Sequence, residues 1–135
     1  MQINDSDGNM LCFVHKPSDW KKGLDFLTDD ALAIQVGTWW YDEGRKLDIH
    51  THNDYPRETR KTMEFVFVVE GRLLAKVFDS SLALVSEFKI HAGEFAVFID
   101  GGHGYETLDS DTKVIEVKNG PFVSAEHDKV KYAWR

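Results

Sequence analysis

The stretch Met63-Glu64-Phe65-Val66-Phe67-Val68-Val69-Glu70-Gly71-Arg72-Leu73-Leu74-Ala75-Lys76-Val77-Phe78 decides the fold class. Residues 63–69 are rich in β-branched and aromatic side chains, and residues 73–78 form a second apolar run of strand length. Between them, Glu70-Gly71 is typical of a tight turn. The stretch therefore predicts a β-hairpin made of two neighbouring strands.

Shorter apolar runs on both sides of this stretch extend the β pattern. Strands are expected at residues 10–15, 31–41, 45–52, 82–90, 94–99, 105–108 and 113–118. Turn-forming residues separate the strands roughly every eight to twelve residues, as in sandwiches and barrels. Residues 18–23 predict only a short capped helical turn. We therefore expect one all-β domain over residues 1–135, with its core at about 30–118 and both terminal segments packed on that core.

Composition narrows the classes of partner. The chain has 135 residues, of which 42% are hydrophobic, so it can bury one core. A formal net charge of −7, without a basic face, argues against nucleic acid as a partner. The apolar runs are much shorter than the roughly 20 residues that span a bilayer. The single cysteine, Cys12, fits a reducing cytoplasm. With nucleic acid and membrane set aside, we expect a small-molecule ligand.

Two histidines mark a polar face on the expected strand 45–52. His50 and His52 project to the same side, because successive side chains of a strand alternate. Two imidazoles on one side of a strand can clamp a divalent metal. The alternative is an edge strand whose polar residues face water.

Two further residues favour the metal interpretation. Glu64 begins an intensely apolar strand, where a lone carboxylate is costly to bury unless it is paired or metal-bound. His103 lies in the glycine-rich segment 99–104, where the backbone can approach a neighbouring group closely. If these strands face one interior, Glu64 and His103 meet His50 and His52 in a three-histidine, one-glutamate site.

The spacing of these residues resembles the first motif of the cupins. That motif runs Gly, five residues, His-x-His, a gap, Glu, six residues, Gly, and here the matching positions are Gly44, His50-Thr51-His52, Glu64 and Gly71. The gap between His52 and Glu64 is eleven residues, whereas the family usually has three or four. The additional length falls in an expected loop, residues 53–62, so the spacing from Glu64 to Gly71 is preserved.

The second cupin motif is matched less closely. Gly93, Gly101 and His103 occupy its glycine and histidine positions, but Ile99 replaces its proline and Thr107 its asparagine, and His103 arrives one residue early. Thr62-Met63-Glu64, Gly101-Gly102-His103-Gly104 and Glu116-Val117-Lys118-Asn119-Gly120-Pro121 are similar to a cupin subgroup often found beside surface-polysaccharide genes. The resemblance covers about residues 30–118.

The resemblance implies a double-stranded β-helix, the jelly-roll barrel of the cupins, with a short helical turn before it. It also implies that His50, His52, Glu64 and His103 are metal ligands in the barrel mouth. Three imidazoles and one carboxylate suit a divalent transition metal such as Zn, Ni, Fe, Mn or Co.

Neighbouring residues are candidates for chemistry and binding. Tyr105 and Glu106 follow the glycine turn and could move a proton. Arg57 and Arg60, in the loop 53–62, could hold an anionic substrate, although a solvated charged loop is the simpler explanation for them. Trp39 could stack on a substrate sugar, or belong to the core or a dimer surface.

Three functions remain open on these grounds. The first is a metal-dependent enzyme acting on a small polar, sugar-derived molecule. The second is a binding or sensing module without turnover, and the third is a metal-independent sugar-nucleotide isomerase or epimerase. A homodimer is expected in each case, because an edge strand and an aromatic N-terminal segment need cover.

Overall fold

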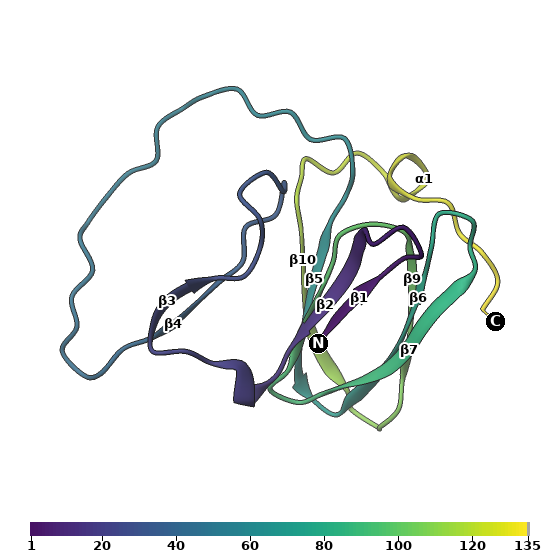
Figure 1. Ribbon diagram of the computed structural model, residues 1–135, viewed down its shortest axis with the longest axis horizontal. Coiled ribbons are helices and arrows are strands. Elements are labelled where there is room, and N and C mark those ends of the chain that lie inside the picture. Colours follow the sequence, from purple (N-terminus) through teal and green to yellow (C-terminus); the bar gives the residue numbers. More distant parts are fainter. Residues whose placement is uncertain (135) are drawn as a thin grey trace.

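The computed structural model describes residues 1–134, and strands make up 41% of it against 5% for helices (Figure 1). The all-β prediction is confirmed. In chain order the elements are β1 (Gln2–Asn4), β2 (Met10–His15), a 3-10 turn (Pro17–Asp19), β3 (Gly23–Phe26), β4 (Gly37–Trp40), β5 (Glu64–Glu70), β6 (Arg72–Phe78), β7 (Leu84–His91), β8 (Phe95–Phe98), β9 (Gly102–Thr107), β10 (Lys113–Lys118) and α1 (Ala125–Asp128).

Within residues 1–134 the strands form three antiparallel sheets. One has five strands in the order β1-β2-β8-β5-β10, a second has the order β7-β6-β9, and β3 pairs only with β4. The two larger sheets form a sandwich and do not close into a barrel within the described chain.

The expected hairpin over residues 63–78 is wrong in its pairing, although both of its strands exist. β5 pairs with β8 and β10, whereas β6 pairs with β7 and β9 in the opposite sheet. Gly71 makes this crossing between sheets with φ +77, and a Cβ there would lie 2.5 Å from the Thr112 hydroxyl oxygen. The apolar side chains predict that each segment forms a strand, but they do not indicate with which other strand it pairs.

The main core lies between the two larger sheets. Val66 and Val68 on β5 face Leu73, Ala75 and Val77 on β6, and all five are buried in one cluster. Every second residue of each strand therefore contributes to this core. Burial of such side chains is the main stabilising contribution to a domain of this size.

A second apolar cluster covers the outer face of the five-stranded sheet. Phe65 and Phe67, which alternate with the core residues of β5, pack with Phe95 and Val97 of β8. The segment between β3 and β4 covers them with the buried side chain of Ile34. Because both of its faces are apolar, β5 reads as an almost continuous hydrophobic run.

The strand expected at residues 45–52 is absent. Residues 41–62, which we call the arm, are exposed throughout and contain no strand. Figure 1 shows the arm running far out from the sheets between β4 and β5. The alternation of side chains in residues 45–52 is real, but no neighbouring strand completes the hydrogen-bond ladder there.

Other expected elements differ from the structure in extent, and β1, β3 and α1 were not expected from the sequence. The strand expected at 31–41 shortens to β4, and the helical turn expected at 18–23 is a 3-10 turn that ends at Asp19. Gly23, with φ +94, begins β3 instead. No helix of the described residues has the length and apolar character needed to cross a membrane.

Candidate functional site

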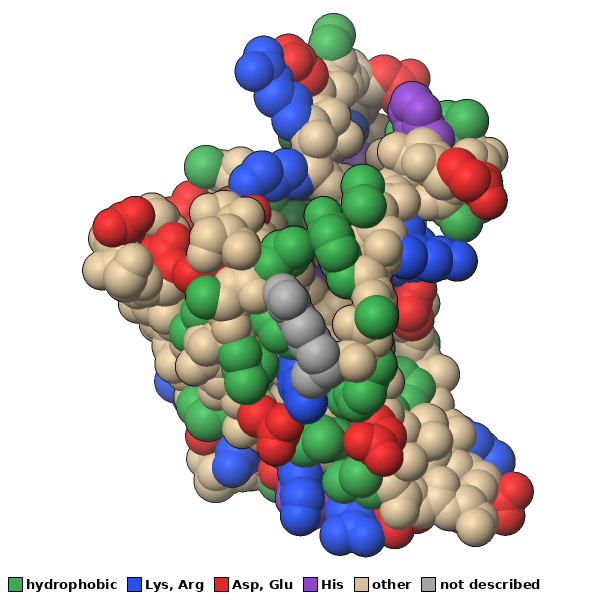
Figure 2. Space-filling model, turned by 90° about the vertical axis from the view of Figure 1, so that its right-hand side faces the viewer, with side chains coloured by type: hydrophobic (Ala, Val, Ile, Leu, Met, Phe, Trp, Pro, Cys, Tyr) green, Lys and Arg blue, Asp and Glu red, His purple; other side chains and the backbone are tan. Residues whose placement is uncertain are grey.

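A cavity of about 660 Å³ lies at one end of the sandwich. Glu64, His103 and Lys118 line it from β5, β9 and β10, and residues 128–134 line it from the C-terminal segment. Figure 2 views the molecule from the side on which this segment runs, and hydrophobic side chains gather on that face. The cavity therefore brings side chains from both sheets to one place.

Glu64 and His103 form a close pair across the sandwich. Glu64 is the first residue of β5 and belongs to its inward-facing set with Val66 and Val68, so its carboxylate is buried to 6% exposure. The Glu64 Oε2 atom lies 3.5 Å from Nε2 of His103. Lys118 stands opposite Glu64 in the β5–β10 ladder, and its Nζ atom also lies 3.5 Å from Oε2. The buried carboxylate is thus flanked by two nitrogen groups.

Tyr105 completes the hydrogen bonding of the carboxylate. It lies two residues after His103 on β9, and its hydroxyl donates to Glu64 Oε1 over 2.8 Å. Phe98 of β8 contacts both rings, with centroids 4.6 Å from His103 and 5.4 Å from Tyr105. The aromatic packing restricts the positions of the imidazole and the phenol.

The electrostatics of the group favour an ionised carboxylate. Burial alone would raise the pKa of Glu64, but hydrogen bonding and charge from His103, with contributions from Tyr105 and Lys118, lower it to about 2. Burial, together with the neighbouring Glu64 charge, raises the pKa of Tyr105 well above its usual range. The hydrogen bond to Glu116 is the main reason that the pKa of Lys118 rises to about 12. At neutral pH, Glu64 is anionic, Tyr105 is protonated and Lys118 is cationic.

Solvent and ligands reach His103 and Lys118 more readily than Glu64. The side chains of His103 and Lys118 are 28% and 23% exposed, against 7% for that of Glu64 behind them. An imidazole that is oriented by a carboxylate and accessible on its other side can accept a proton from a bound molecule and donate it back. The arrangement is therefore suited to general acid–base chemistry on a molecule bound in the cavity.

The C-terminal segment covers part of this cavity. The indole of Trp134 packs on Gly104, where an added Cβ would lie 2.8 Å from a ring carbon. The Nζ atom of Lys76 lies 4.9 Å from the Trp134 ring centre. At the other end, the Thr62 hydroxyl donates to the carboxylate of Asp128. These contacts hold the segment over the mouth of the cavity.

Only part of the four-residue metal set assembles. Glu64 and His103 meet, but His50 and His52 lie in the exposed arm, with their ring centroids 5.1 Å apart and Nδ1 of His50 3.0 Å from the carbonyl oxygen of Asp48. Across residues 1–134, no three or more His, Cys, Asp or Glu side chains are grouped so that they could hold a metal ion. The residues as placed do not fit the metal that the resemblance implies.

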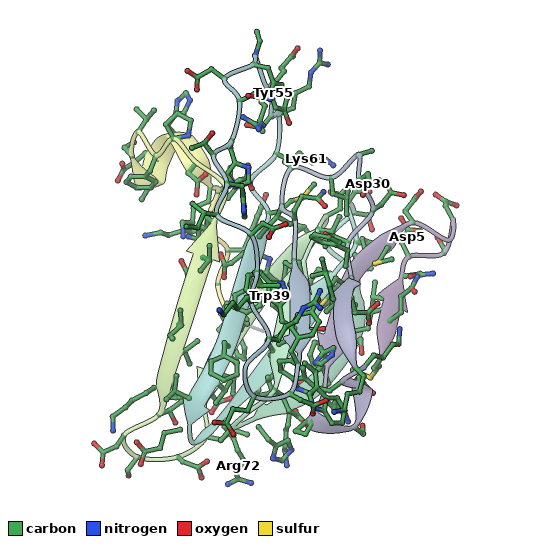
Figure 3. The ribbon with its side chains drawn as sticks, turned by 90° about the vertical axis from the view of Figure 1, so that its left-hand side faces the viewer. Asp5, Asp30, Trp39, Tyr55, Lys61 and Arg72 are labelled. Carbon is green, nitrogen blue, oxygen red and sulfur yellow. The ribbon has the colours of Figure 1, made fainter. Side chains whose placement is uncertain are left out.

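The other expected site residues lie outside the cavity. Glu106 is exposed and, by strand alternation, projects away from the side of β9 that carries Tyr105. In the arm, the guanidinium of Arg57 lies 3.7 Å from the Tyr55 ring centre, and Arg60 pairs with Glu58. Arg60 also lines a second, more polar cavity of about 610 Å³. Trp39 is 60% exposed on β4 (Figure 3).

Lys118 and the segment 129–134 are site elements that the sequence did not indicate. Lys118 ends an apolar strand next to Glu116, which reads as a surface ion pair, and that pair does exist at 2.8 Å. Its second contact, to Glu64, depends on the pairing of β5 with β10. The position of Lys118 in the cavity could be predicted only if the register between β5 and β10 were known.

Comparisons with protein-family models, with curated proteins and with solved structures found no match for this chain.

Proposed function

We propose that this protein binds a small polar molecule, such as a sugar derivative, and catalyses a proton transfer on it, with His103 as the acid–base group. The observation that carries the proposal is the contact of His103 Nε2 with the buried Glu64 carboxylate at the wall of a cavity. Isomerisation or epimerisation next to a carbonyl group is the reaction class that needs only such a group.

The size and lining of the cavity support a small-molecule ligand. A volume of about 660 Å³ lies within the range of roughly 300–1,000 Å³ that small-molecule sites occupy. Apolar walls from Phe78 and Trp134 alternate with polar groups from Ser80, Lys129 and Lys131. Hydroxyl and ammonium groups of this kind suit a polyhydroxylated or anionic ligand.

Each residue of the group has a distinct role in this mechanism. His103 takes a proton from the carbon next to the substrate carbonyl, and an enolate forms. In epimerisation the imidazolium returns the proton to the opposite face of the same carbon after the enolate has turned in the cavity. In isomerisation it returns the proton to the former carbonyl carbon, while the hydroxyl proton of the enediol passes to the other oxygen. Glu64 orients the imidazole and stabilises its protonated form. Tyr105 donates its own proton to Glu64, so we assign it a positioning role, and Lys118 offsets the carboxylate charge.

The metal-independent isomerase or epimerase expected as one alternative agrees best with these contacts. The jelly-roll architecture implied by the resemblance remains part of the proposal, with the two-sheet sandwich as its support. A metal centre is the second candidate, because Glu64 and His103 present two ligand atoms to the cavity. It would require His50 and His52 to leave the positions described above.

Solvent deuterium exchange tests the proposed function. The tag-free protein, treated with chelator, is incubated in D₂O with a panel of keto-sugar nucleotides, and deuterium incorporation is followed by NMR. We expect incorporation at a carbon next to the carbonyl group, and a loss of at least about a hundredfold in His103→Asn, as is typical for an acid–base residue. The matched control is His91→Asn, a histidine of β7 outside the residues that line the cavity.

Two outcomes would contradict the proposal. Ligand binding without any exchange would indicate a binding module. Exchange that appears only after a transition metal is added, and that disappears in His50→Ala, would favour the metal centre.

A further inference from the structure

The hairpin of β3 and β4 exposes its apolar side to solvent. Leu24 stands opposite Trp39, and Phe26 stands opposite Gly37, in the β3–β4 ladder. The exposed fractions are 48% for Leu24, 60% for Trp39 and 62% for Phe26. The alternating residue Thr38 is buried beneath the hairpin. An outward apolar face of this kind is the reverse of the usual pattern and marks a contact surface.

A second apolar strip lies on the edge strand of the five-stranded sheet. Ile115 and Val117 of β10 pair in register with Phe67 and Phe65, so they share the outer face of the sheet. They are 52% and 50% exposed. Figure 3 shows that the hairpin carrying Trp39 and the outer side of β10 both face the same side of the molecule. We call Leu24, Phe26, Trp39, Ile115 and Val117 the outer apolar face.

Within the part of β10 that borders Ile115 and Val117, the charged side chains point away from this face. Glu116 and Lys118 alternate with Ile115 and Val117 along β10, so they project to the opposite side of the sheet, where they pair at 2.8 Å. The chain has a formal net charge of −7, which opposes association between copies over most of the surface. The side chains of Glu116 and Lys118 therefore do not bring like charges together when a second copy meets the outer apolar face.

The area of the face suits a dimer. A large apolar side chain that is completely exposed presents roughly 150–250 Å² of surface. With the exposed fractions given above, the five side chains together present on the order of 500 Å² of apolar surface per copy. A stable interface buries about 800 Å² per partner, and homodimer interfaces are about 65% apolar. The outer apolar face therefore supplies most of the apolar area that one dimer needs.

We propose that a second copy of this chain docks on the outer apolar face, so that Trp39 and Ile115 of each copy are buried by the other. The arm begins directly after β4, next to this face, and exposes Leu47, Ile49 and Tyr55. In the dimer the arm lies along the second copy, which buries those three side chains. The interface is separate from the cavity, so the proposal does not depend on the proposed function.

Sedimentation equilibrium of the full-length protein tests this interface. We expect the unmodified protein to be a dimer, and Trp39→Glu and Ile115→Lys each to raise the dimer dissociation constant by at least about thirtyfold, as for interface hot spots. The control is Leu84→Glu, which places a charge at a 54% exposed apolar position on β7 in the other sheet. This control should leave the dissociation constant unchanged.

Circular dichroism and the thermal midpoint establish that each variant is folded. If Trp39→Glu fails to fold, Ile115→Lys on a different strand decides the question. A monomer at concentrations on the order of 100 µM would overturn the proposal. A dimer that survives the change on the outer apolar face but dissociates in Leu84→Glu would also overturn it.

Discussion

β5 and residues 45–52 of the arm are both expected to be strands from the sequence, but only β5 forms one. Residues 46–50 alternate charged or polar side chains with apolar ones, whereas β5 is an almost continuous apolar run between Glu64 and Glu70. β5 is hydrogen-bonded to β8 on one side and to β10 on the other. Residues 45–52 have no strand partner in the described chain, and all of them are exposed to solvent.

The difference shows that alternation along the chain does not by itself produce a strand. Isolated extended segments are marginal in water, because unpaired backbone groups and exposed side chains gain little from the extended conformation. β5 is hydrogen-bonded on both edges, and both of its faces are packed. Val66 lies in the main core on one face, and Phe65 lies in the second apolar cluster on the other. Pairing and burial therefore decide which of the two expected strands forms.

The largest expected contrast comes from the same substitution in the two regions. Ile90 of β7 is fully buried in the main core, whereas Ile49 of the arm is fully exposed. Ile90→Ala should lower the free energy of unfolding by about 2–5 kcal/mol, because it removes buried methyl groups and leaves a cavity. Ile49→Ala should change it by less than about 0.5 kcal/mol. Urea unfolding checks both, and comparable losses would show that the arm is buried in solution.

The next effect concerns Glu64, which stands where the arm ends and β5 begins. Its pKa is about 2 in the folded chain against an ordinary value of 4.5. Because the folded-state pKa is the lower one, the ionised form stabilises the fold above pH 4.5, and this contribution is lost as the pH falls towards 2. The shift corresponds to on the order of 3 kcal/mol.

Glu64→Gln should therefore be less stable than the unmodified protein at pH 7. The difference in the free energy of unfolding between the two proteins should shrink between pH 4.5 and pH 2. Urea unfolding at several pH values measures it. A difference that does not vary with pH would show that the carboxylate is not held by His103, Tyr105 and Lys118.

Two glycines extend the comparison to the backbone. Both have positive φ, +71 at Gly101 before β9 and +82 at Gly44 in the arm. A Cβ at Gly101 would collide with the carbonyl oxygen of Phe78, whereas nothing lies within 4 Å at Gly44. Gly101→Ala should lower the free energy of unfolding by about 2 kcal/mol or more, since left-handed strain alone costs roughly 1–2 kcal/mol. Gly44→Ala should have a smaller effect, and equal thermal midpoints for the two variants would contradict this.

The smallest expected effect lies within the site. Tyr105→Phe removes the hydroxyl that donates to Glu64 Oε1 and leaves the ring in place against Phe98. Hydrogen bonds to charged groups contribute about 1.5–3 kcal/mol, and water entering from the cavity should offset part of this loss. We expect a loss near the lower end of that range by urea unfolding. A gain in stability would argue against the hydrogen bond.

The sequence predicted most strands because their residues carry a local signal. The runs 10–15 and 113–118 match β2 and β10 at both ends, and Glu64 and His103 were expected to meet, as they do. Pairing could not be predicted in the same way. The crossing at Gly71 sends β6 into the opposite sheet, and no residue of the strand itself indicates which sheet it joins.

The site was predicted in part for the same reason. His50 and His52 were placed by their spacing, but spacing along the chain does not require that a strand bring them to Glu64. Tyr105 was expected near the site and lies there, in contact with the carboxylate. Lys118 was missed because its place depends on the register between β5 and β10.

The most direct test of the central claim is the histidine side-chain NMR spectrum of three proteins: the unmodified chain, Glu64→Gln and His50→Ala. If Glu64 and His103 form the functional pair apart from the arm, the His103 ring signals should shift in Glu64→Gln and stay in place in His50→Ala. His103 signals that move in His50→Ala and not in Glu64→Gln would contradict the claim.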